Sequence, residues 1–596
     1  MPSTDAMRTS ARWALRLAPL GAVAATGLRS GDFGARDVLA VARGARRGPV
    51  LLTLDLTRPL RPEGGGLAAL RARNRPTLRQ VLDALAWAVG DDRVVGLLGR
   101  VGVAPGGLAT VQELARAVRR FAATGRPCIA HSEAFGEVGN GTPAYLLATA
   151  FGEVHLQPSG ELSLLGVAGE VTFLRGALDK AGLEPQLEHR HEYKNASDVL
   201  TRHEFTPAHR EALDSLVDDW AAQVVTAIAD ARGLDEPAVR DAVDVAPLLA
   251  PEARDRGLVD RLAYLDESLA DLRSRVGADA DLQPLADYHS ATAARQRWRS
   301  RRGPKVALID ATGPITVRGG GVPLSGPGVT SDRLCADLRS AAANDDITAV
   351  VLRVDSPGGS AVASDAIRRE VIRTREAGTP VIAWMGDVAG SGGYYVAMAA
   401  DAIVAQPGTL TGSIGVIGGK AVSAGLERKL GVHTDAVTRG AHARFYSGTT
   451  DFSDSERARL AAQLDFIYDD FTGKVAHDRQ LPLPQVLDVA KGRVWTGAQA
   501  RERGLVDRLG GFTDVLAAVR TAVGVGSDVP LRVHRHPPSP SLADRLRGRT
   551  HTDPAQEEVA ALLAAAPLDA AGLLDALRGA SPVRGTLSMP WIPRLR

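Results

Sequence analysis

Ser391 stands among three glycines in the stretch DVAGSGGYYVAMAAD, residues 387–401, directly before a run of small apolar residues. Glycines let a backbone turn sharply, so these residues suit either a nucleophile held at the start of a helix or a small residue in a tight turn. A serine hydroxyl is a weak nucleophile and needs a neighbouring base. A catalytic role for Ser391 therefore requires a base elsewhere in the chain.

Lysine is a candidate base because it is rare here: 7 of the 71 basic residues are lysines and the others are arginines. A buried amine can lose its proton, whereas a guanidinium stays charged in proteins. Such a lysine needs a pKa lowered from about 10.4 to about 7 or 8, which burial in an apolar pocket provides. Each lysine can equally be an ordinary surface residue. The seven are Lys180, Lys194, Lys305, Lys420, Lys429, Lys474 and Lys491.

The chain repeats its landmarks at an interval of about 250 residues. RGPVLLTLD at 47–55 corresponds to RGPKVALID at 302–310, and RGLVDRL occurs identically at 256–262 and 503–509. This duplication predicts five segments along the chain. They are an N-terminal segment (1–44), a first repeat (45–275), a linker (276–302), a second repeat (303–530) and a C-terminal extension (531–596).

The two repeats differ at the residues that could do chemistry. An offset of 249 residues places Thr142 opposite Ser391, Ala443 opposite Lys194, and Leu164 opposite Ser413. Each repeat has thus kept a polar group that the other lacks. This pattern predicts one composite site, with a lysine from the first repeat and a serine from the second.

Two further features bear on that site. In DSPGGS, the amides of Gly358 and Gly359 could stabilise a developing oxyanion together with the amide of Gly392, although P-G-G is also a common turn. His189 and His191 lie close to Lys194 in HRHEYKNASD and are alternative bases, or solvated side chains of a polar run.

Apolar, β-branched runs alternate with stretches of helical period, which predicts an α/β fold with largely parallel sheets. Examples are the runs 306–309, 349–354 and 381–384 and the helical stretch 361–374. The linker reads as a charged helix, and 555–579 as an amphipathic tail.

Composition narrows the function classes. The net charge of +2 gives no reason to expect a nucleic-acid partner, and neither a metal-ligand cluster nor a phosphate loop is visible, so no cofactor is expected. Cys128 and Cys335 fit no disulfide framework and are read as small buried side chains. The uncharged run 17–28 is shorter than the roughly 20 residues of a membrane span. It could form an amphipathic membrane-surface helix or resemble a poor signal peptide.

The motifs RVDSPGGS, GSGGYYVAMAAD, GTLTGSIGVIG and YKN, with the duplicated layout, resemble the long form of signal peptide peptidase A. That family of bacterial membrane-associated serine proteases belongs to the Clp protease and crotonase superfamily. The resemblance spans about residues 45–525 and implies two tandem ββα superhelical domains. It further implies that Ser391 is the nucleophile, Lys194 the general base and Ser413 a residue that orients the lysine, with an oxyanion hole around Gly359 and Gly392.

The resemblance also implies the biological setting. The substrates would be cleaved signal peptides and other short apolar peptides, and the protein would form a homo-oligomer, a tetramer in the family, at the cytoplasmic membrane. Two other functions stay open on the residues alone. One is a crotonase-type acyl-CoA enzyme, which would need no serine and lysine divided between repeats; the other is a catalytically silent oligomeric scaffold.

Overall fold

The computed structural model describes residues 48–61, 75–137, 139–317, 328–537 and 583–588. Its residues group into two compact units, each assembled from separate stretches of the chain. The first unit comprises 1–105, 114–165 and 231–303, and the second comprises 106–113, 166–230 and 304–596. The segment 166–230, which lies in the first sequence repeat, therefore groups with the second repeat.

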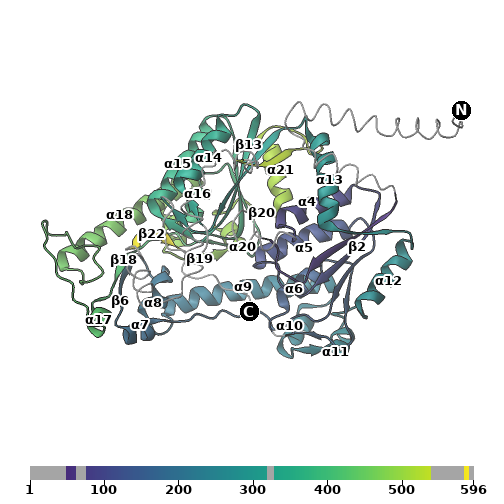
Figure 1. The fold of residues 1–596 in the computed structure, drawn as a ribbon, viewed down its shortest axis with the longest axis horizontal. Coiled ribbons are helices and arrows are strands. Elements are labelled where there is room, and N and C mark those ends of the chain that lie inside the picture. The colour runs from purple at the N-terminus through teal and green to yellow at the C-terminus, as the bar shows by residue number, and fades with distance from the viewer. Residues whose placement is uncertain (1–47, 62–74, 138, 318–327, 538–582, 589–596) are drawn as a thin grey trace, which may run out of the picture. The chain divides into compact units, whose positions relative to one another are not determined.

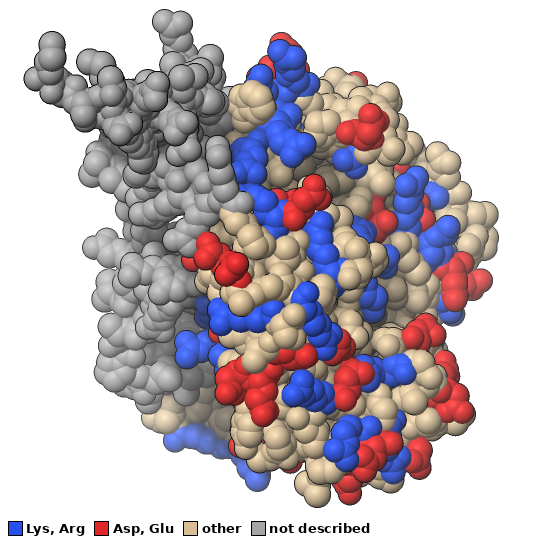
Figure 2. Space-filling view, turned by 90° about the vertical axis from the view of Figure 1, so that its right-hand side faces the viewer, with Lys and Arg blue, Asp and Glu red and all other residues tan. Residues whose placement is uncertain are grey.

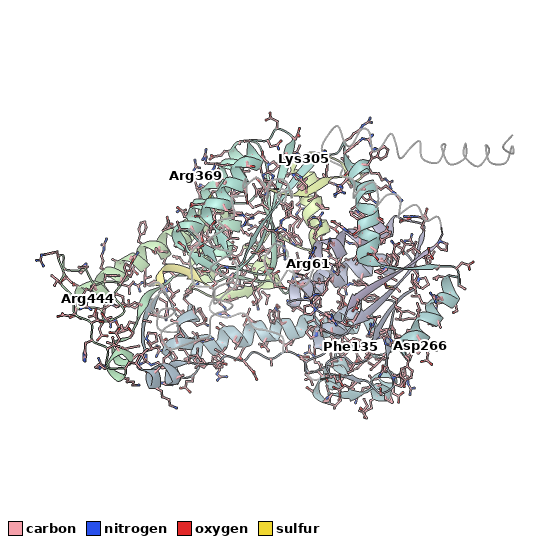
Figure 3. The ribbon with its side chains drawn as sticks, in the orientation of Figure 1. Arg61, Phe135, Asp266, Lys305, Arg369 and Arg444 are labelled. Atoms are coloured by element: carbon pink, nitrogen blue, oxygen red, sulfur yellow. The ribbon has the colours of Figure 1, made fainter. Side chains whose placement is uncertain are left out.

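A six-stranded sheet forms the centre of the first unit, and all its neighbouring strands run parallel. From edge to edge its strands are β8 (Arg261–Leu262), β4 (Glu153–Leu156), β3 (Cys128–Ser132), β2 (Val94–Val101), β1 (Val50–Leu56) and β9 (Asp281–Pro284). Helix α12 (Leu265–Val276) packs on this sheet beside β2 and β3 (Figure 1). Phe135, labelled in Figure 3, is buried in this unit and packs edge-to-face against Tyr145.

The second unit contains a sheet with the corresponding strand order, again parallel along this path. Along this path lie β20 (Arg508–Leu509), β16 (Ala402–Ala405), β15 (Val381–Gly390), β13 (Ile347–Ser356), β10 (Lys305–Thr312) and β21 (Arg532–Arg535). Two further strands, β17 (Leu410–Gly412) and β19 (Val494–Thr496), branch from β15 and complete the eight-stranded sheet. Helices α14 (Ser331–Ala342) and α15 (Ala361–Glu376) pack against each other beside it (Figure 1). The α/β fold and its parallel sheets are thus confirmed.

The repeated RGLVDRL sequence makes the same contacts in both units. In the first unit Leu258 accepts a hydrogen bond from the Tyr145 hydroxyl, and Asp260 accepts one from the Val154 amide. In the second unit Leu505 accepts from the Tyr394 hydroxyl, and Asp507 from the Ile403 amide. An arginine at the end of a 26-residue helix then pairs with each aspartate. These arginines are Arg232 of α9 (Pro207–Arg232) and Arg479 of α18 (Asp454–Arg479).

A second sheet of the second unit is built from strands that are distant in sequence. Its order is β12 (Val329–Thr330), β11 (Ile315–Thr316), β14 (Gly358–Ser360), β22 (Val583–Ser588), β18 (Ile417–Val422) and β6 (Glu184–His189). Strand β6 comes from the first repeat and pairs antiparallel with β18 over six residues. This pairing joins the lysine-bearing segment to the unit that carries Ser391.

Several sequence expectations can be compared directly with these elements. The three apolar runs lie in β10, β13 and β15, and the stretch 361–374 lies in α15. The charged linker forms α13 (Leu285–Ser300), as expected, but its start also supplies β9, which pairs with β1. Cys128 and Cys335 are both buried. The run 17–28 and the stretch 555–579 lie outside the described residues.

Two properties of the described residues concern the molecule's surroundings. None of their helices is both long and apolar enough to cross a bilayer. On the face shown in Figure 2, basic and acidic side chains are interspersed, as the small net charge leads one to expect.

Candidate active site

Ser391 lies between the end of β15 and the start of α16 (Gly392–Ala397). Its backbone has φ +55° and ψ −115°, which a residue with a side chain rarely adopts. The Ser391 amide donates to the Gly412 carbonyl at 2.7 Å, and its carbonyl accepts from the Tyr395 amide at 2.9 Å. These bonds from both sides hold a strained conformation, which is a common feature of functional residues.

The glycines that follow Ser391 are required by close packing. A Cβ on Gly392 would lie 2.7 Å from Ser364 Oγ and 3.1 Å from both Gly358 Cα and Gly359 N. A Cβ on Gly393 would lie 2.5 Å from the Ser356 carbonyl oxygen. The glycines thus let the turn after Ser391 lie directly against β14.

Lys194 begins the short 3₁₀ helix Asn195–Ser197, and its side chain is fully buried. Its Nζ lies 2.9 Å from Ser391 Oγ, 3.0 Å from Ser413 Oγ and 3.0 Å from the Ser413 carbonyl oxygen. Ser391 and Ser413 are also fully buried. The structure therefore brings together the three side chains that the comparison of the repeats singled out.

Two glycines confine the stem of Lys194. A Cβ on Gly492, which has φ +81°, would lie 2.4 Å from Lys194 Cβ. A Cβ on Gly415 would lie 3.2 Å from Lys194 Cδ. The Gly492 amide donates to the Ile414 carbonyl at 2.7 Å, so the two loops that enclose the lysine are themselves joined.

Burial controls the charge of Lys194. It lowers the pKa of the amine from 10.5 to about 7, and burial is the only cause of this shift. An amine with that pKa is substantially neutral near neutral pH. A neutral amine has two N–H groups and one lone pair, which matches the oxygens of Ser413 as acceptors and the Ser391 hydroxyl as a donor.

The three expected oxyanion amides do not lie in equivalent surroundings. The Gly358 amide donates to Ser356 Oγ at 3.1 Å, inside the turn, and so has an acceptor already. Gly359 N lies at the contact between β14 and the turn after Ser391. Gly392 begins α16, where helix amides have no acceptor within the helix. Gly359 and Gly392 therefore fit an anion-binding role better than Gly358 does.

Both histidines near Lys194 make other contacts. His189 Nδ1 lies 2.8 Å from the carbonyl oxygen of His191, and the His191 ring packs on Tyr468 with centroids 4.4 Å apart. His191 is exposed. These contacts favour Lys194 over the imidazoles as the base for Ser391.

The supporting residues could not be singled out in the sequence. Gly415 and Gly492 resemble any loop glycines, and Ser356 and Ser364 sit in stretches read only as a turn and a helix. A second buried lysine, Lys420, lies on β18 with its Nζ 4.1 Å from the Phe452 ring centroid. Rarity and burial therefore do not separate Lys194 from Lys420; the contact of Lys194 Nζ with Ser391 Oγ does.

Glu153, His155 and Asp271 are close enough to hold a metal ion among the described residues. Arg275 pairs with both of these carboxylates, however, and its Nη2 lies 2.6 Å from Asp271. A cationic side chain thus already balances the charge of this cluster, which belongs to the first unit. Its contacts give no reason to place a metal there.

Comparison with known proteins identifies the family. The model of peptidase family S49 matches residues 121–279 and 373–526. The chloroplastic serine protease SPPA of Arabidopsis thaliana is 32% identical over 501 residues, which cover 83% of this chain and 73% of that protein. Protease 4 of Salmonella typhi is 30% identical over 453 residues, which cover 74% of this chain and 71% of that protein.

Among solved structures, a mutant of the membrane-bound stomatin-specific protease 1510-N in complex with a substrate peptide is 16% identical, with a TM-score of 0.26. The similarity covers 42% of this chain and 98% of that one. The resemblance to long-form signal peptide peptidase A is confirmed by the relatives, which match over most of the chain. With two matched segments that together span more than half of its length, the chain belongs to peptidase family S49 and is a serine peptidase.

Proposed function

We propose that the protein hydrolyses peptide bonds through a Ser391/Lys194 dyad and degrades remnant signal peptides and other short apolar peptides. The single observation that carries this proposal is the 2.9 Å contact between the buried Lys194 Nζ and Ser391 Oγ. The lowered pKa of Lys194 supports it, because a general base works best with a pKa near the operating pH.

In the first half of the reaction, Ser391 Oγ attacks the peptide carbonyl carbon while its proton passes to the Nζ lone pair of Lys194. The carbonyl oxygen becomes an oxyanion close to the amides of Gly359 and Gly392. The C–N bond then breaks, and the leaving amine takes the proton from Lys194. An ester between the peptide and Ser391 remains.

In the second half, water attacks the ester carbonyl and gives a proton to Lys194. The C–O bond to Ser391 breaks, the proton returns to Oγ, and the acid product leaves. Ser413 accepts hydrogen bonds from Lys194 in the resting state, which directs the lone pair of Nζ at Ser391. Neither half needs a metal or a nucleotide.

Family membership supports a proposal for the setting. We propose that the protein works at the bacterial cytoplasmic membrane, where cleaved signal peptides remain, and that it forms a homo-oligomer, a tetramer as in long-form relatives. No observation favours an acyl-CoA substrate or a silent scaffold.

The test combines activity with covalent labelling. We expect Ser391→Ala and Lys194→Ala each to lower hydrolysis of an apolar fluorogenic peptide by at least about a thousandfold. Mass spectrometry should locate a serine-reactive acylating probe on Ser391, with much slower labelling in Lys194→Ala. Controls are Thr142→Ala, the counterpart of Ser391 in the first repeat, and Lys429→Ala at an exposed lysine. Wild-type turnover by either dyad variant would refute the proposal.

A further inference from the structure

Besides β21, the C-terminal extension contributes a second described element, the strand β22 (Val583–Ser588). It pairs antiparallel with β14, with Gly358 opposite Ser588, Gly359 opposite Leu587 and Ser360 opposite Thr586. It also pairs antiparallel with β18, with Ile417 opposite Thr586 and Gly419 opposite Val583. Figure 1 shows β22 beside β18. The segment Val583–Ser588 is therefore an interior strand of this sheet.

Without β22 this sheet would be divided in two. The other edge of β14 pairs with β11, and the other edge of β18 pairs with β6. Because both strands run antiparallel to β22, they run parallel to each other and stand two strand spacings, about 9–10 Å, apart. We call this position between β14 and β18 the strand slot. It accepts one extended chain, which binds through backbone hydrogen bonds on both edges.

The strand slot adjoins the proposed catalytic residues on both sides. On one side, β14 contains Gly358 and Gly359, which contact the turn after Ser391. On the other side, β18 begins four residues after Ser413, which contacts Lys194. An extended peptide in the strand slot would therefore have its backbone close to Ser391.

The two dyad residues are fully buried in the structure that contains β22. A peptide must displace some element to reach Ser391. Strand β22 is the candidate for displacement, because it occupies the position of an extended peptide between β14 and β18.

We propose that β22 is a built-in competitor: the segment Val583–Ser588 fills the strand slot in place of a substrate peptide and keeps the peptidase inhibited until the segment leaves. This proposal rests on the proposed function, since it assigns β22 to the substrate position of that site. Release of β22 opens the strand slot to any extended peptide with free backbone groups.

An intramolecular competitor has a defined kinetic signature. Only molecules with an open strand slot bind substrate. The apparent KM therefore equals the intrinsic KM divided by the fraction of open molecules, while kcat is unchanged. If the slot is closed in about nine molecules of ten, opening it fully lowers KM about tenfold.

Thr586 is the residue at which to open the slot, because it is paired on both sides, with Ser360 and with Ile417. Thr586→Pro removes its amide, and proline is not tolerated within a central strand. Thr586→Val keeps the amide and a β-branched side chain and is the matched control. In the full-length chain we expect Thr586→Pro to lower KM about tenfold with kcat unchanged, and Thr586→Val to behave as wild type. Equal KM values for all three proteins would overturn the proposal.

A binding experiment separates this proposal from the catalytic one. In a Ser391→Ala background, a fluorescent, end-blocked apolar peptide should bind more tightly to the Thr586→Pro chain than to the Thr586→Val chain, by fluorescence anisotropy. A synthetic peptide of residues 583–588 should compete for binding to the Thr586→Pro chain. Tighter binding in the Ser391→Ala background, together with no hydrolysis by the Thr586→Pro chain that retains Ser391, would support the competitor and contradict the dyad. Equal affinities would contradict the competitor whatever the activity.

Discussion

Lys194 owes its lowered pKa to burial alone, so its titration should appear directly in the pH dependence of catalysis. In the proposed mechanism the neutral amine is the base, and its population increases as the pH rises through about 7. We therefore expect kcat/KM to rise with pH with a midpoint near 7 and then to level off. Lys194→Arg, which cannot deprotonate, should be inactive at every pH. A profile that falls across this range would contradict the assignment.

The same burial should make Lys194 costly for stability. A pKa lowered from 10.5 to about 7 corresponds to a cost on the order of 5 kcal/mol near neutral pH. The unfolded state binds the proton more tightly, so this cost is full below pH 7 and disappears as the pH rises towards 10.5. Replacing Lys194 by methionine removes this cost but also removes three hydrogen bonds of about 1 kcal/mol each. Lys194→Met should therefore be more stable than wild type by roughly 2 kcal/mol at pH 7.

Thermal unfolding measures this difference. Lys194→Met should have a Tm several degrees above wild type at pH 7, and the gap should shrink and then reverse towards pH 10. A difference in Tm that does not change with pH would mean that packing, rather than the charge of Lys194, causes the difference in stability.

Ser391 carries backbone strain in addition to its chemistry. Its φ of +55° costs about 1–3 kcal/mol for a residue with a Cβ, and glycine avoids that cost. Ser391→Gly should therefore unfold at a higher temperature than Ser391→Ala, although both lack the hydroxyl. A lower Tm for the glycine variant would show that the turn is not strained.

At the scale of elements, the loop between α19 (Leu483–Val489) and β19 (Val494–Thr496) positions the lysine through Gly492. Gly492→Ala adds a Cβ within 2.4 Å of Lys194 Cβ at φ +81°, so Nζ must move away from Ser391. We expect kcat to fall at least about a hundredfold, because small misplacements of a catalytic group are costly. Gly524→Ala is the matched control, since Gly524 has φ +69° and no atom near its added Cβ. Equal activities of the two variants would show that the Gly492 contact does not position Lys194.

The helices and strands also show which parts of the structure could be predicted from the sequence. The runs in β10, β13 and β15 and the helix α15 follow from hydrophobic period, and Ser391, Lys194 and Ser413 follow from comparing the repeats. The pairing of β6 with β18 does not follow, because periodicity gives the face of a strand but not its partner. The hydrogen bond from the Gly358 amide to Ser356 Oγ could not be predicted either, because the acceptor of an amide depends on how the turn folds.

At the scale of the whole molecule, duplication explains both the symmetry and its breakdown. Both units retain the strand order and the RGLVDRL contacts of one ancestral fold. The segment 166–230 of the first repeat nevertheless belongs to the second unit, which thereby holds both members of the proposed dyad. Lys194 and Ser391 thus contact each other within one chain, although they come from different repeats.

This arrangement predicts the outcome of mixing two inactive variants. Ser391→Ala and Lys194→Ala chains, differently tagged and co-expressed, should copurify if the protein is a homo-oligomer. Each chain still carries one defective member of its own dyad, so the mixture should be as inactive as either variant alone. If the lysine came from a neighbouring subunit, random mixing would restore about a quarter of the sites. Recovery of activity towards that level would show that the dyad is shared between chains.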